Sequence, residues 1–95
     1  MSENNEISIH EVRIYNVLQS NQTQWITNKQ IATEAKVSGR TARLHTLRLV
    51  KLGILDQAEV FPAHRYRISE KASKRNVAYV QRLEKAKEVF GDMSS

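Results

Sequence analysis

The feature that most restricts the fold is a pair of short helical patterns separated by a three-residue break. Residues 27–35 and 39–52 both carry apolar side chains three or four positions apart, which is the spacing of one face of an α-helix. Val37-Ser38-Gly39 interrupts the pattern between them. Two short helices joined by so short a turn form a helix-turn-helix motif.

Capping signals support these boundaries. Thr27 opens a capping box, in which its oxygen accepts a hydrogen bond from the Gln30 backbone N–H and the glutamine side chain reaches back. Ser38 is placed to cap the second helix. Gly53 stands where the end of that helix favours a left-handed residue. Both helices therefore have predictable ends.

Further helices are expected on either side of this motif. Residues 8–20 place apolar side chains at helical spacing, and residues 24–26 are predicted as a very short strand that follows. After Ser69, which is placed as a cap, a long helix is predicted over residues 70–90. At about 30 Å, this helix is too long for a small core to cover.

Between the motif and the last helix, the sequence predicts a β-hairpin. Residues 54–61 and 65–68 have strand character, and the turn between them puts His64 at the tip. Arg65 and Arg67 alternate with apolar side chains in the second strand. Because strand side chains alternate between faces, both arginines are expected to point away from the core.

The predicted order is α-β-α-α-β-β-α, a mainly α fold with a small β-hairpin. A hairpin that follows a helix-turn-helix motif makes a winged helix-turn-helix. The segments 27–32, 37–42, 49–55 and 66–72, in this order and spacing, resemble bacterial winged helix-turn-helix transcription regulators. The resemblance implies a sequence-specific binder of double-stranded DNA, most simply a small dimeric repressor.

Three residues depart from the pattern of these regulators. Lys36 stands in the turn where they often have glycine, Thr46 takes a position usually held by leucine, and Ala72 replaces a frequent glycine. The chain is therefore not assigned to a subfamily.

The charge is unevenly distributed along the chain, whose formal net charge is +5. Residues 29–51 carry six Lys and Arg against one glutamate, and residues 61–75 carry five against one. Two acidic residues separate these zones. Two basic zones are expected to engage one polyanion, while the alternative is two solvated helix faces.

A helical wheel divides residues 39–52 into two halves. Ala42, Thr46 and Leu49 cluster on one side, which is expected to face the core, with His45 at its edge. The basic side chains fall on the other half, where burial without a partner would be costly. Leu44 and Leu47 lie among them, and the alternative is a rotated helix in which these two leucines are core.

The expected DNA contacts come from three places. The first turn of the second helix is expected to reach base edges in the major groove, where an arginine can bridge a guanine and Leu44 can touch a thymine methyl group. The hairpin is expected to reach a phosphate or the minor groove. The start of the first helix can offer backbone N–H groups to a phosphate. The candidate residues are Thr27, Asn28, Lys29, Ser38, Gly39, Arg40, Thr41, Arg43, Leu44, Arg48, His64, Arg65 and Arg67.

The last helix is expected to form a homodimer. Its apolar stripe would stay exposed unless a second copy buried it, and the alternative is a helix that folds back over its own core. A dimer would place two recognition helices about 34 Å apart on DNA. The predicted dimer contacts are Tyr79, Val80, Leu83, Ala86 and Phe90.

The predicted organisation is a tail at 1–7, a DNA-binding domain at 8–69, a dimerisation helix at 70–90 packed on it, and a tail at 91–95. Two other roles stay open. One is a plasmid or phage replication or partition factor that binds DNA. The other is a protein-interaction module on the same scaffold, favoured by the exposed leucines. RNA binding ranks third, because it usually shows exposed aromatic side chains on a sheet.

Several function classes find no support in the residues. The chain has no cysteine, only three glycines, and three histidines far apart, so no metal site, cofactor or enzyme activity is expected. No apolar run approaches the roughly 20 residues that span a bilayer. The polar, acidic N-terminus is unlike a signal peptide. A cytoplasmic, nucleoid-associated protein is the expectation.

Overall fold

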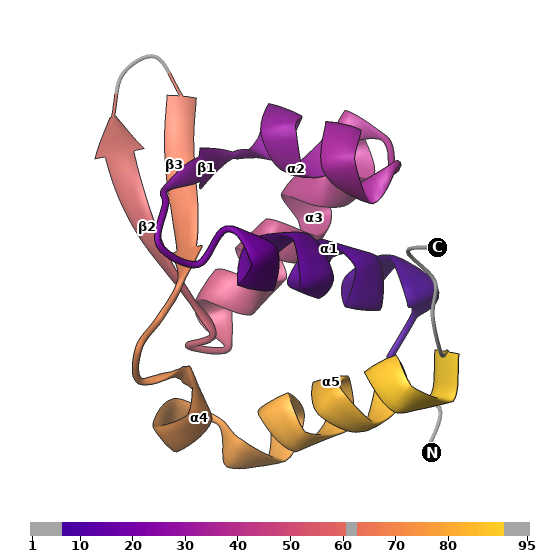
Figure 1. The fold of residues 1–95 in the computed structure, drawn as a ribbon. Helices are drawn as coiled ribbons and strands as arrows, with labels where there is room; N and C mark the ends of the chain where they lie inside the picture. The colour runs from indigo at the N-terminus through magenta and orange to yellow at the C-terminus, as the bar shows by residue number, and fades with distance from the viewer. Residues whose placement is uncertain (1–6, 61–62, 91–95) are drawn as a thin grey trace.

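The computed structural model describes residues 7–60 and 63–90. Their order is the predicted one, with the last helix in two pieces (Figure 1). The elements are α1 (Ile9–Ser20), β1 (Ile26–Thr27), α2 (Asn28–Ala35), α3 (Gly39–Lys51), β2 (Leu55–Val60), β3 (Ala63–Ile68), α4 (Ala72–Arg75) and α5 (Val77–Phe90).

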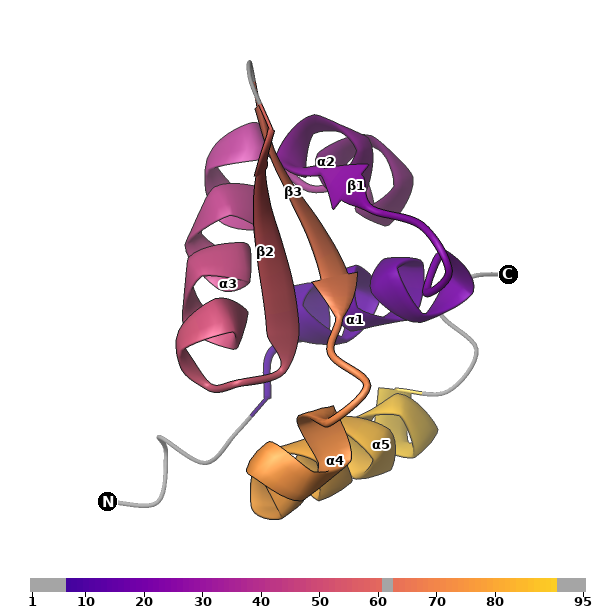
Figure 2. The ribbon, with the colours of Figure 1, turned by 90° about the vertical axis from the view of Figure 1, so that its left-hand side faces the viewer.

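The three strands form one antiparallel sheet in the order β1-β3-β2. Tyr66 of β3 lies opposite Ile26 of β1 and Gln57 of β2. Tyr66 is buried, while Arg65 is exposed and Arg67 is half-buried. The predicted alternation is therefore confirmed. Helix α3 packs against β2, and α2 packs against α3 and reaches β3 (Figure 2).

Side-chain caps begin the first three helices. Ser8 and Glu11 form a full capping box at α1. Thr27 Oγ1 accepts from the Gln30 N–H at 3.2 Å, as predicted. The Gln30 side chain, however, donates to Glu34 instead of reaching back, so the predicted capping box is only half formed. The Thr27 cap alone is sufficient to begin α2.

The turn between α2 and α3 and the end of α3 depend on one side-chain cap and two residues with left-handed backbone. Ser38 Oγ accepts from the Thr41 N–H at 3.0 Å and caps α3 as predicted. Gly53 has a φ of 82°, which confirms the left-handed residue after α3. Lys36 has a φ of 60° at the end of α2. A left-handed backbone favours glycine, which is the residue that the sequence pattern led us to expect there.

The last helix is not continuous, so the prediction of one helix over 70–90 was wrong. Asn76 Oδ1 accepts from the Tyr79 N–H at 3.3 Å, and Asn76 Nδ2 donates to the Leu52 carbonyl at 3.2 Å. An asparagine side chain that bonds nearby backbone competes with helical hydrogen bonds and favours a cap. The predicted Ser69 cap was also wrong, because Ser69 Oγ accepts from the Lys71 N–H in a turn before α4, and α4 has no side-chain cap.

Helix α5 packs on α1 through polar contacts on successive turns. The Tyr79 hydroxyl donates to the buried Glu11 carboxylate. The Tyr15 hydroxyl donates to Glu84 at 3.2 Å, and burial together with this carboxylate raises the pKa of Tyr15 to about 12. Burial and the bond to Glu11 also raise the pKa of Tyr79. Both tyrosines therefore stay protonated and act as donors.

These contacts place α5 in the core of the chain itself. Tyr79 and Leu83 are buried without a second copy. The prediction that they would form an exposed stripe was wrong, and the alternative of a helix folded back over its own core holds for them. Val77, Val89 and Phe90 remain exposed on α5.

Candidate nucleic-acid interface

Helix α3 presents the two faces that the wheel predicted. Ala42, Thr46 and Leu49 are buried. Leu44 and Leu47 are 64% and 48% exposed, so the alternative of a rotated helix was wrong. The outward half also carries the exposed side chains of Arg40, Arg43, Arg48 and Lys51.

The arginines of α3 are not neutralised within the described part of the chain. Two ion pairs occur there, Arg75 with Asp56 and Lys87 with Glu84, and neither involves α3. No acidic residue occurs between Ser38 and Asp56. Unpaired guanidinium groups gathered on one helix face attract an anionic partner.

The N-terminus of α3 is open to such a partner. The first turn leaves backbone N–H groups free of helical bonds, and these carry a partial positive charge. Ser38 and Thr41 bond each other through their hydroxyls at 2.9 Å, which fixes the turn. Gly39 is exposed, and nothing lies within 4 Å of where a side chain would begin. A phosphate can therefore approach this backbone closely.

At the start of α2, the structure separates two predicted contact residues. Lys29 is exposed. Asn28 turns inward instead, where its Oδ1 accepts from the Thr46 hydroxyl at 2.8 Å and its Nδ2 faces the Tyr66 hydroxyl at 3.5 Å. Both ends of its side-chain amide are therefore used inside the protein, and the expected phosphate contact of Asn28, which involves its backbone N–H, stays a prediction.

The hairpin also differs from its prediction in two residues. His64 lies within β3, opposite Glu59, and alternation puts it on the other face from Arg65, not at the tip with it. Arg67 stacks on the ring of Trp25, which lies in the loop before β1, and its guanidinium carbon is 4.3 Å from the ring centre. Arg65 is therefore the exposed arginine of the described hairpin.

The sequence reasoning missed the Trp25–Arg67 stack. A cationic guanidinium over an indole ring is a favourable contact, and it holds β1 to β3 on the outer face of the sheet. The sequence showed the short strand with its tryptophan and the second strand of the hairpin. That these two strands pair became clear only from the register, in which Ile26 lies opposite Tyr66.

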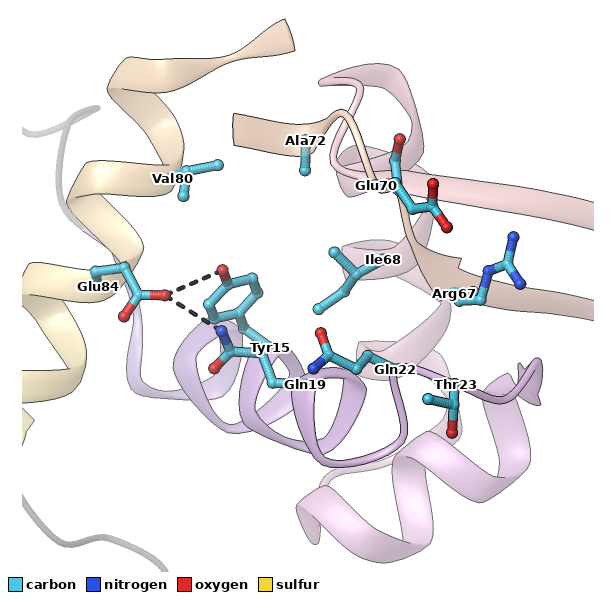
Figure 3. Close-up of a pocket in the computed structure, with 11 residues that line it drawn as sticks. Tyr15, Gln19, Gln22, Thr23, Arg67, Ile68, Glu70, Ala72, Val80 and Glu84 are labelled. Atoms are coloured by element: carbon cyan, nitrogen blue, oxygen red, sulfur yellow. Dashed lines mark hydrogen bonds between the residues drawn. The ribbon is translucent and has the colours of Figure 1, made fainter. Parts of the chain in front are cut away.

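A hollow of about 610 Å³ lies between α1, the end of β3 and α5 (Figure 3). Tyr15 and Gln19 point toward Glu84 across it, and Arg67, Ile68 and Val80 line other sides. The hollow is separate from the exposed face of α3. Tyr15 and Gln19 both donate to the Glu84 carboxylate, so these three polar groups are paired with one another.

His45 is half-buried at the edge of the core, as predicted. Its Nδ1 is buried without a hydrogen-bond partner in the described residues. Burial lowers the pKa of His45, against the opposing pull of Glu11, so the ring is neutral at pH 7. Within residues 7–60 and 63–90, no three His, Asp or Glu side chains gather as metal ligands.

No helix in the described ranges has the length and apolarity needed to cross a membrane. The chain matches no protein-family model and none of the curated proteins.

Several solved structures share the fold. MepR, a transcription regulator of the Staphylococcus aureus multidrug efflux pump MepA, superposes with a TM-score of 0.64 at 13% identity, over 93% of this chain and 66% of MepR. ZitR of Lactococcus lactis gives 0.55 at 18% identity, over 90% and 56%. The adhesin competence repressor AdcR of Streptococcus pyogenes gives 0.57 at 15% identity, over 94% and 66%.

The chain thus spans about two thirds or less of the length of these three regulators. At such low identity the likeness concerns the fold, and it confirms the winged helix-turn-helix. The candidate DNA-contact residues are therefore supported by the geometry of this chain and not by the solved structures.

Proposed function

We propose that this chain is a sequence-specific DNA-binding protein that acts as a small transcriptional regulator. The observation that carries the proposal is the exposed face of α3, with three arginines that have no carboxylate partner in the described residues. A MepR variant with the same fold was solved bound to an oligodeoxyribonucleotide, and its alignment covers 99% of this chain. Both observations favour duplex DNA as the polyanion.

We propose different tasks for the exposed residues. Arg40 and Arg43 lie in the first turns of α3, where a helix-turn-helix reaches base edges, and each can bridge O6 and N7 of a guanine. Thr41 and the α3 N-terminus can bind a phosphate. The other candidate basic side chains are Lys29, Arg48 and Arg65, which would position the protein on the phosphates of the DNA.

We further propose a homodimer through the outer side of α5. Tyr79 and Leu83 are used inside the chain, so the contact would involve Val80, Ala86 and Phe90, which retain partial exposure, with Val77 and Val89 beside them. Residues 8–69 would then form the DNA-binding unit and residues 70–90 would join two copies. Such a dimer occupying a promoter would act as a repressor associated with the nucleoid in the cytoplasm.

The first test is the salt dependence of binding to a labelled duplex selected from random sequences. The logarithm of the association constant should fall linearly with the logarithm of the salt concentration, because binding releases counterions from each neutralised phosphate. About four phosphate contacts for each protomer contribute about −3.6 to the slope, and a bound dimer would double this value. Fluorescence anisotropy at five salt concentrations measures it. Absence of a salt-dependent complex with any duplex would refute the proposed function.

The exposed leucines favour a second candidate function, a protein-interaction module. Leu44 and Leu47 lie among the arginines of α3, where they fit either thymine methyl groups or an apolar protein surface. The two candidates make opposite predictions about the methyl groups of the DNA.

Replacing the thymines of the selected site with uracil should therefore weaken binding. Uracil keeps the base pairs and removes the C5-methyl group, and one buried carbon is worth about 0.8 kcal/mol, or about fourfold in affinity. Leu44→Ala should weaken binding to the thymine duplex. The affinity of this variant should change little when uracil replaces thymine. If the wild type binds both duplexes equally, the leucines do not read thymine, and a protein partner becomes the better explanation for them.

A further inference from the structure

A partly buried series of hydrogen bonds connects α3 to the hairpin. The Thr46 hydroxyl of α3 is fully buried and donates to Asn28 Oδ1 at the start of α2, at 2.8 Å. Asn28 Nδ2 in turn donates to the Tyr66 hydroxyl of β3 at 3.5 Å. Three elements far apart in sequence thus meet through polar side chains inside the fold.

Thr46 is the departure from the regulator pattern that the sequence analysis noted. A leucine there would only fill space, whereas a buried hydroxyl that lost its partner would be destabilising. The hydroxyl also lies 3.1 Å from the carbonyl of Arg43 in its own helix. The single hydroxyl hydrogen can serve either acceptor, and the shorter bond, to Asn28, is the one that links α3 to another element.

This bond acts together with the buried Ala42 and Leu49 to set how α3 is turned about its axis. Successive residues of a helix are rotated by about 100°, so facing Thr46 toward Asn28 keeps Arg40 and Leu44 on the outward half. A small rotation would lengthen the bond and displace both outward side chains together. At the hairpin end of this series of hydrogen bonds, Tyr66 is the sequence neighbour of Arg65 in β3.

We infer that Thr46 and Asn28 are positioning residues that set the orientation of α3 relative to the hairpin and thereby the discrimination between DNA sequences. The inference rests on the proposed function. Neither side chain touches DNA. Their effect arises because bidentate base contacts require accurate geometry, whereas long cationic side chains reach phosphates over a range of helix orientations.

The test compares two substitutions at one position. Thr46→Val keeps the shape and removes the hydroxyl, and Thr46→Ser keeps the hydroxyl and removes the methyl group. Thr46→Val should lower the ratio of affinities for the selected and random duplexes about tenfold, within the range of one base contact. Affinity for the random duplex should change less than twofold. Thr46→Ser should keep the wild-type ratio, although it leaves a small cavity.

A second measurement needs no DNA. Backbone N–H residual dipolar couplings of the free protein report the orientation of α3 relative to β3, and they should change in Thr46→Val and not in Thr46→Ser. Unchanged couplings and an unchanged affinity ratio in Thr46→Val would overturn the inference, as would a parallel loss on both duplexes. If the wild type binds no duplex, the proposed function fails, and the couplings alone still decide whether Thr46 orients the helix.

Discussion

Replacing Arg40 and Arg43 together by alanine is expected to lower affinity for the selected duplex about a hundredfold. Both side chains are exposed at the start of α3 and carry no partner in the described residues. A good bidentate contact to guanine is worth about 1–3 kcal/mol, so two contacts at the lower part of that range give about 2.8 kcal/mol. On a random duplex, only phosphate contacts are lost, and the decrease should stay below tenfold.

The control removes the same charge elsewhere. Arg82 and Lys85 are exposed on α5, so replacing both by alanine changes the net charge equally without altering α3. Anisotropy titrations of the three proteins at one salt concentration give the affinities on both duplexes. Equal losses on selected and random DNA in the α3 variant would show that these arginines bind phosphate only, and base readout by α3 would be rejected.

Leu83→Ala is expected to have the largest effect on stability. Leu83 is fully buried against the chain's own core. Truncating a buried leucine to alanine typically costs about 2–5 kcal/mol, since both the transfer energy and the contacts around the cavity are lost. A domain of this size has only about 5–15 kcal/mol to lose. Urea unfolding followed by circular dichroism measures the change.

The same experiment separates the core role of Leu83 from a dimer role. Loss of a core contact should appear equally in dilute and concentrated protein, whereas loss of a dimer contact depends on protein concentration. Val89→Ala is the matched control, because Val89 is 74% exposed and should change stability by less than about 0.5 kcal/mol in dilute protein. If dilute Leu83→Ala unfolds at the wild-type urea concentration, the packing of α5 described above is incorrect.

The helix ends show how much of the fold local sequence can decide. Thr27, Ser38 and Gly53 act on groups one to three residues away, so their roles could be predicted without knowing the fold. The outward face of α3 was predictable for a related reason. Periodicity assigns Arg40 and Leu49 to opposite sides of any helix, and the cost of burying an unpaired arginine selects which side is the core.

The errors occurred where a side chain had a choice of partners. Asn28 was given a role only for its backbone N–H, and the sequence did not reveal that Thr46 and Tyr66 bind its side-chain amide. Asn76 was read as an ordinary helical residue, but it bonds Leu52, 24 residues away, and divides the last helix. In both cases the partner lies on another element, and a periodic pattern contains no information about it.

Apart from the break in the last helix, sequence alone determined the elements, their order and the charged face of α3, because caps and periodicity act within a few residues along the chain. Only the tertiary structure decided that Tyr79 and Leu83 complete the core and that Arg67 stacks on Trp25. The physical reason is that a side chain's burial and bonding depend on which surfaces the folded elements bring into contact.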